Sequence, residues 1–82
     1  MDLKDTVKLM QSDDYRERFM AEYYQLNIRC GKLRKMLEKW DNDALGFQPS
    51  CNRGLLAYQL RAMENYLTAL ESRAQIENIE LW

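Results

Sequence analysis

The chain has 82 residues, a net charge of −1 and no histidine, so it fits one domain and lacks the commonest general base and metal ligand. Its 12 basic and 13 acidic residues give no overall attraction to nucleic acid, and we do not expect nucleic-acid binding. The two cysteines do not have the spacing of a metal site, and no glycine-rich phosphate loop is present. We therefore expect no metal, no cofactor and no enzymatic activity.

The N-terminal residues 1–11 place Leu3, Val7 and Met10 at helical spacing, which fits either a short helix or a frayed arm. Ser12 follows, with two aspartates behind it. A serine before acidic residues is typical of a helix N-cap, since the acids lie at the positive end of the helix dipole. The pattern predicts that a long helix starts at about residue 13.

Over residues 13–41, apolar side chains recur at alternating spacings of four and three. They are Phe19, Tyr23, Leu26, Cys30, Leu33, Leu37 and Trp40. A mean spacing of about 3.5 residues puts them in one stripe along an α-helix. Gly31 interrupts this helix; a tolerated defect is the favoured interpretation, and close approach of another backbone or of a ligand is the alternative.

Turn-forming residues cluster at 42–50, and a second stripe follows over about 51–77. Its members are Leu56, Leu60, Met63, Leu67, Leu70 and Ala74. Ser50 or Asn52 is expected to cap this second helix. Asn78 suits the left-handed residue that ends a helix, and we expect the apolar tail 78–82 to fold back over the helices or onto a neighbour.

These patterns predict an all-α fold in which residues 1–82 form a single domain, a long antiparallel two-helix hairpin. Cys30 and Cys51 then lie far apart, so we expect no disulfide between them. Two free cysteines fit a reducing compartment, and neither a signal peptide nor a run of about 18 apolar residues is present. We predict a cytoplasmic protein.

A hairpin of this size buries little core, and without a disulfide or metal the remaining source of stability is a second subunit. Apolar side chains also lie off both stripes: Tyr15, Met20, Tyr24, Ile28, Met36, Leu55, Tyr58, Tyr66 and Ala69. Scattered surface apolar residues are normal, but here we expect a homo-oligomer, an oligomeric helical bundle.

Charge is divided along the hairpin. Residues 29–64, the half nearest the turn, hold seven basic and four acidic residues, a net +3, and the rest of the chain has a net −4. Ordinary solvated helix faces would explain this. The sharper interpretation is a site for a small anionic ligand, because arginine binds phosphate oxygens in pairs and aromatic faces stack on bases.

For that site we predict three cations, Lys32, Arg53 and Arg61, with Phe47 or Tyr58 as an apolar wall. Antiparallel pairing should put Lys32 near Arg61, and the turn should hold Phe47 over the start of the second helix, where free backbone N–H groups favour an anion. Tyr15 and Arg18, at the far end of the hairpin, are second-rank candidates. Antiparallel assembly would bring them close to the basic end of a neighbouring subunit.

Four runs carry a family resemblance: YRERFMAEY (residues 15–23), LGFQPSC (45–51), QLRAMENYL (59–67) and ESRAQIENIEL (71–81). Together they resemble the small helical-hairpin proteins of crAss-like phages and related prophages. The chain departs from that family at Asn52, where a proline often follows the turn cysteine, so the start of the second helix is shifted by a residue.

The resemblance implies a function, because other small phage hairpin proteins are oligomeric sponges for immune signals. On this analogy the chain is a non-enzymatic anti-defence protein in an infected bacterial host. It would bind and sequester a nucleotide of the cyclic ADP-ribose or cyclic oligonucleotide type, and so silence Thoeris or CBASS immunity. The alternative is a structural or protein-binding coiled-coil module, such as a phage inhibitor or assembly factor.

Overall fold

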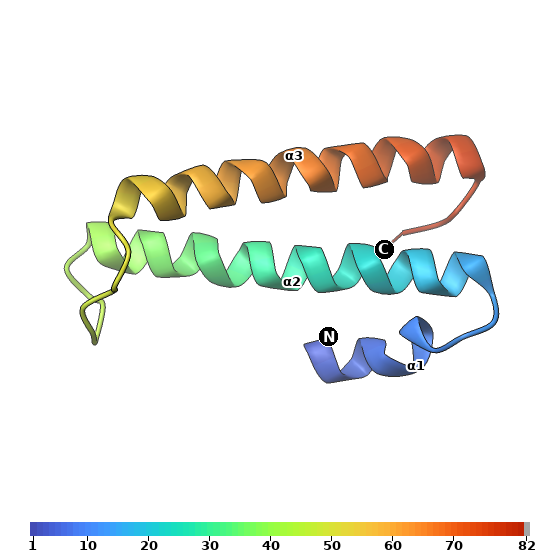
Figure 1. Cartoon of the computed structure of the whole chain (residues 1–82), viewed down its shortest axis with the longest axis horizontal. Coiled ribbons are helices and arrows are strands. Elements are labelled where there is room, and N and C mark those ends of the chain that lie inside the picture. Colours follow the sequence, from blue (N-terminus) through green and yellow to red (C-terminus); the bar gives the residue numbers. More distant parts are fainter. Residues whose placement is uncertain (82) are drawn as a thin grey trace.

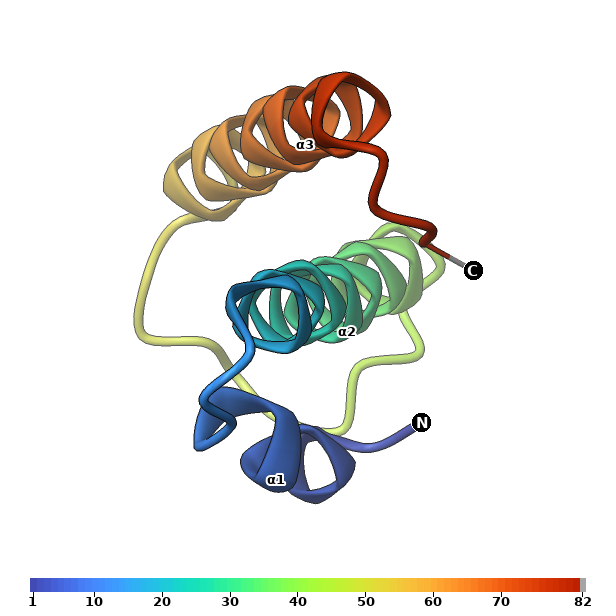
Figure 2. The ribbon, with the colours of Figure 1, turned by 90° about the vertical axis from the view of Figure 1, so that its right-hand side faces the viewer.

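The computed structural model describes residues 1–81, which form helices and no strand. The elements are the 3-10 helix η1 (Leu3–Thr6) and the α-helices α1 (Val7–Met10), α2 (Tyr15–Asp41) and α3 (Arg53–Glu77). α2 and α3 run antiparallel side by side, and η1 and α1 lie on the opposite side of α2 (Figures 1 and 2). The all-α prediction is confirmed. The structure adds a third layer, the N-terminal segment Leu3–Met10, to the two helices that the sequence predicted.

Helix α2 begins at Tyr15, two residues after the predicted start. Its cap is Asp14, whose Oδ1 accepts a hydrogen bond from the Arg16 backbone N–H at 2.9 Å. The prediction that Ser12 caps the helix is wrong: the Ser12 hydroxyl donates to Glu17 Oε1 at 2.5 Å and accepts from the Asp14 N–H at 3.0 Å. Ser12 therefore braces the turn before the helix, and a carboxylate takes the capping position.

Helix α3 begins at Arg53, again two residues late, and its cap is Asn52, whose Oδ1 accepts from the Leu55 N–H at 2.8 Å. Of the two predicted caps, the structure therefore uses Asn52. The helix ends at Glu77, and the next residue, Asn78, has the predicted left-handed conformation with φ 57° and ψ 43°. This bend lets the Ile79 N–H donate to the Ala74 carbonyl at 2.9 Å and turns the tail back over the helices.

The core lies between the first half of α2 and the last half of α3. It consists of buried Phe19, Leu70, Ala74 and Ile79, with the half-buried side chains of Met20, Tyr23, Leu26 and Leu81 packed against it. Most of these residues belong to the two predicted stripes. Ile79 and Leu81 confirm that the tail folds back; Trp82 lies outside the described residues.

The N-terminal segment packs on the face of α2 that points away from α3. Thr6 is fully buried there, its hydroxyl donating to the Leu3 carbonyl at 2.7 Å and accepting from Gln25 Nε2 at 2.9 Å. Ala21 and Tyr24, on this side of α2, are buried as well. Of the two interpretations of residues 1–11, the structure therefore has the short helix, and it covers part of the apolar surface that led us to expect a partner subunit.

Three smaller expectations have outcomes in this fold. Cys30 is buried, Cys51 is exposed, and both are free, as predicted. A Cβ added at Gly31 would meet no atom within 4 Å, so no backbone of the described chain approaches this glycine closely. Within residues 1–81, no helix combines the length and the apolar character that a membrane span requires.

Candidate functional site

The connecting loop, residues 42–52, does not take the shortest path from α2 to α3. From the end of α2 it runs to the side of α2 that faces away from α3, crosses that side, and then returns to the start of α3 (Figures 1 and 2). Asp43 has a left-handed backbone with φ 54°, which aspartate tolerates better than most residues. The loop thereby brings Leu45 and Phe47 against side chains near the end of α2.

A hollow of about 330 Å³ lies where the loop meets α2. We call it the lysine hollow. It is lined by Lys32, Lys35, Met36 and Lys39 from α2 and by Leu45 and Phe47 from the loop. The volume is within the usual range for small-molecule pockets. Phe47 is 60% exposed, so its ring is a wall of this hollow that stays accessible from solvent.

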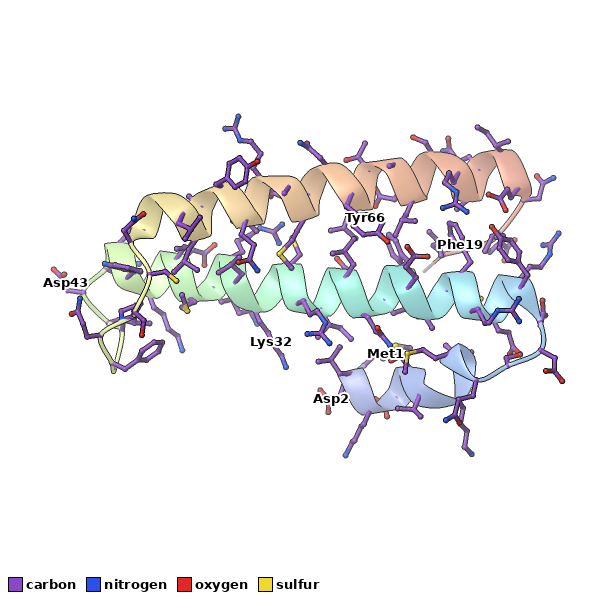
Figure 3. All side chains as sticks on the ribbon, in the orientation of Figure 1. Met1, Asp2, Phe19, Lys32, Asp43 and Tyr66 are labelled. Carbon is purple, nitrogen blue, oxygen red and sulfur yellow. The ribbon has the colours of Figure 1, made fainter. Side chains whose placement is uncertain are left out.

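The three lysines share one face of α2 because they follow one another at steps of three and four residues. All three are exposed, and none forms an ion pair with the described residues. Lys32 extends away from α3, into the open stretch of α2 between the N-terminal segment and the connecting loop (Figure 3). Three uncompensated ammonium groups on one face favour an anion, and lysine binds phosphate as a point charge.

Beside α3, another hollow of about 300 Å³ is less suited to an anion. Met10, Glu22, Gln25, Leu26, Arg29 and Tyr66 line it. The Tyr66 hydroxyl donates a hydrogen bond to the Glu22 carboxylate, and that bond, with some burial, raises the pKa of Tyr66. The carboxylate is therefore engaged in joining α3 to α2, and its charge offsets that of Arg29.

A similar contact joins the two helices at the next residue of α2. The Tyr23 hydroxyl donates to Glu71 Oε2 at 2.8 Å. Burial, reinforced by this hydrogen bond to a carboxylate, raises the pKa of Tyr23. Both tyrosine hydroxyls therefore link α2 to α3 through hydrogen bonds to carboxylates. The lysine hollow is the better candidate for an anionic ligand.

Of the residues predicted to form the site, the structure brings Lys32 and Phe47 together in the lysine hollow. Phe47 lines two hollows, and their other lining residues belong to α2 and the connecting loop. Lys32 points away from α3, which carries Arg61, so the two are not directed toward each other within one chain.

The remaining predicted residues lie elsewhere. Arg53 is held by Asp41 through two hydrogen bonds of 2.8 Å, and Tyr58 and Arg61 are exposed on α3. At the far end of α2, the Tyr15 hydroxyl donates to Glu77 and accepts from Arg73, both at 2.8 Å. Arg18 donates to the Ser12 carbonyl at 2.8 Å. These two residues fasten the helix ends of their own chain.

Comparison with known proteins identifies the family. The model of the Sequestin family matches residues 13–76, which span α2, the connecting loop and nearly all of α3. The chain belongs to the Sequestin family. The family name indicates a protein that sequesters another molecule, and so one that binds a ligand. No curated protein and no solved structure matches the chain.

The Sequestin match begins after the N-terminal segment, so the lysine hollow lies wholly inside the matched region. Sequence reasoning missed four residues of this hollow: Lys35, Met36, Lys39 and Leu45. The signal that could have found the two lysines was their helical spacing from Lys32, on the face of the helix away from the predicted apolar stripe. The path of the loop, which supplies Leu45, has no comparable signature.

Proposed function

We propose that this Sequestin is a non-enzymatic phage anti-defence protein that sequesters a nucleotide immune signal. Family membership supports the sequestering role. The resemblance to phage signal sponges supplies the ligand class, a cyclic ADP-ribose type or cyclic oligonucleotide signal of Thoeris or CBASS immunity. Sequestration needs affinity and no bond chemistry, and it works when the protein is more abundant than the signal and binds it below the signal's working concentration.

The lysine hollow is the site we favour for this ligand. The observation that supports it is the row of Lys32, Lys35 and Lys39, without ion-pair partners among residues 1–81, beside an exposed phenylalanine. The ammonium groups would hold phosphate oxygens, and the Phe47 ring would stack on the base. Met36, which also lines the lysine hollow, offers a polarizable surface that adapts to flat ligands.

Calorimetry with cyclic ADP-ribose isomers and cyclic dinucleotides tests this proposal, with adenosine monophosphate as a control for weak phosphate binding. A signal present at about 100 times its dissociation constant should stabilise the fold by about 2.7 kcal/mol, which thermal melting detects. If no member of the panel binds or shifts the melting temperature, the proposed ligand class is wrong.

Three single variants, two in the lysine hollow and one control, then locate the site. Lys35→Gln and Lys39→Gln remove charge from the lysine hollow, and Lys8→Gln removes the same charge from the exposed surface of α1. Each hollow variant should weaken binding of a confirmed ligand by about ten-fold or more, the effect of losing a hydrogen bond to a charged group. Lys8→Gln should bind like the parent chain. Equal affinity in all three variants would exclude the lysine hollow.

The residues proposed from the sequence provide the competing location. Arg53→Ala, Arg61→Ala and Tyr58→Ala test the surface of α3, and Tyr15→Phe with Arg18→Gln tests the far end of α2. If these changes weaken a confirmed ligand while the lysine variants do not, the ligand binds away from the lysine hollow and the function survives at a different site.

A protein-binding module is the second candidate, because α3 exposes large apolar side chains. Tyr58 is 73% exposed and Ile76 is 81% exposed, and exposed apolar patches mark protein-binding surfaces. Absence of binding to every signal, together with a protein that co-purifies from infected cells and is lost when Ile76 becomes Glu, would favour this module.

A further inference from the structure

Among residues 1–81, no helix packs on the side of α3 that faces away from α2 (Figures 1 and 2). α3 also carries an exposed apolar row. It consists of Leu55, Ala62, Ala69 and Ile76, which we call the outer seam. Each member lies seven residues after the previous one, so the four lie nearly in line along the helix. Leu55 is 54% exposed, Ile76 is exposed still further, and both alanines are exposed.

The outer seam reads the same in both directions: a large side chain, two small ones and a large one. Turned end for end, a second α3 would place its Ile76 opposite Leu55 and its Ala69 opposite Ala62. The small pair in the middle lets two helix backbones approach closely, while the large pairs close both ends. An interface with a two-fold axis requires this self-complementarity, because each contact occurs twice.

Charge favours the antiparallel arrangement over the parallel one. The turn end, residues 29–64, has a net +3, and the remainder has a net −4. Two parallel copies would bring like ends together, and two antiparallel copies bring the basic end of one against the acidic end of the other.

We propose that two copies of the chain associate antiparallel along the outer seam, with the two-fold axis passing between Asn65 and Tyr66. This inference does not depend on the proposed ligand. Lys32 of the lysine hollow extends from α2 away from α3 (Figure 3), so such a dimer leaves both of its hollows open and has two equivalent binding sites.

Sedimentation equilibrium of the full chain tests the surface. Ala69→Glu puts a charge in the middle of the outer seam, and Ala44→Glu makes the same change at an exposed alanine of the connecting loop. We expect the parent chain and Ala44→Glu to dimerise, and Ala69→Glu to dissociate about ten-fold more readily or more, with an unchanged helical circular dichroism spectrum. A parent chain that stays monomeric at high micromolar concentration overturns the proposal, as does a dimer that Ala69→Glu does not weaken.

Cysteine cross-linking tests the register, in a Cys51→Ser background that removes the exposed thiol. Antiparallel pairing puts residue 62 opposite residue 69, so a mixture of Ala62→Cys and Ala69→Cys chains should form a disulfide-linked heterodimer. Each variant alone should cross-link poorly, because its own thiols are offset by about 10 Å along the axis, beyond disulfide reach. Efficient self-linkage of Ala62→Cys, with no preference for the mixture, would show parallel pairing and overturn the proposed register.

Discussion

Arg53 and Asp41 join the two ends of the connecting loop. Arg53 Nε donates to Asp41 Oδ1 and Arg53 Nη2 donates to Asp41 Oδ2, both at 2.8 Å. The first residue of α3 and the last residue of α2 thus form a two-bond ion pair. A planar guanidinium matches a carboxylate in this two-bond geometry, which also fixes direction. The pair therefore holds the helix ends together while the loop between them reaches across to the lysine hollow.

We predict that Arg53→Ala lowers the free energy of unfolding by about 0.5–1 kcal/mol, a modest amount because both side chains are near half exposed and water screens the pair. Asp41→Asn should have a similar effect, and the double variant should cost less than the sum of the two. Urea denaturation of the four chains measures this coupling. Strictly additive effects would mean that the ion pair contributes nothing to stability.

The buried contact between Thr6 and Gln25 should determine whether the N-terminal segment stays on α2. Thr6→Val keeps the shape of the side chain but leaves Gln25 Nε2 without its oxygen acceptor. We predict a loss of about 1–3 kcal/mol in local stability, read as faster amide hydrogen exchange in residues 3–10. Exchange in the middle of α3 should change much less. Equal acceleration throughout the chain would show that the segment folds as one unit with the helices.

The left-handed Asn78 makes a prediction about the tail. Asn78→Gly should preserve or slightly raise the thermal stability, because glycine adopts φ 57° without steric cost. Asn78→Ala should lower the free energy of unfolding by about 1 kcal/mol, since a Cβ is strained in that conformation. Thermal melting of both variants tests this, and equal melting temperatures would show that the tail can turn back by another route.

Tyr23 and Tyr66 predict a loss of stability in alkali. The pKa of each phenol is raised in the folded chain above the ordinary value of 10.0, so folding disfavours the ionised form. Their contribution is therefore complete below pH 10 and declines as pH rises through the folded pKa.

Urea denaturation of the parent chain between pH 9 and pH 11 should thus show falling stability. The double variant Tyr23→Phe/Tyr66→Phe lacks both titrating groups, and the part of the decline that they cause should disappear. An equally steep decline in the double variant would assign the alkaline loss to other groups.

The fold was largely predictable because apolar spacing reports which side of a helix is buried. Phe19, Cys30 and Leu37 of the first stripe, and Leu67, Leu70 and Ala74 of the second, are all buried as expected. The helix starts were less predictable, since two neighbouring polar side chains compete to cap a helix. At α2 the carboxylate of Asp14 took the position that we assigned to Ser12, whose hydroxyl had another partner in Glu17.

The candidate site was predictable only where it follows helical geometry. The expected antiparallel pairing of the two helices placed Lys32 level with Arg61, but it ignored the direction in which each side chain leaves its helix. The path of the connecting loop depends on Asp43, which adopts a left-handed backbone, and on the ion pair between Arg53 and Asp41. Neither is encoded in hydrophobic periodicity, so the position of Phe47 had to come from the structure.

The lysine row belongs to a continuous helix, and this affects the thermodynamics of whatever occupies it. Lys32, Lys35 and Lys39 start from backbone positions about 4.5 and 6 Å apart along α2, already fixed before any ligand arrives. Ordering on binding would then be limited to three flexible lysine stems and the loop that carries Phe47. Capture should therefore leave the helical circular dichroism signal unchanged, with an entropic cost far smaller than that of a receptor that folds around its ligand.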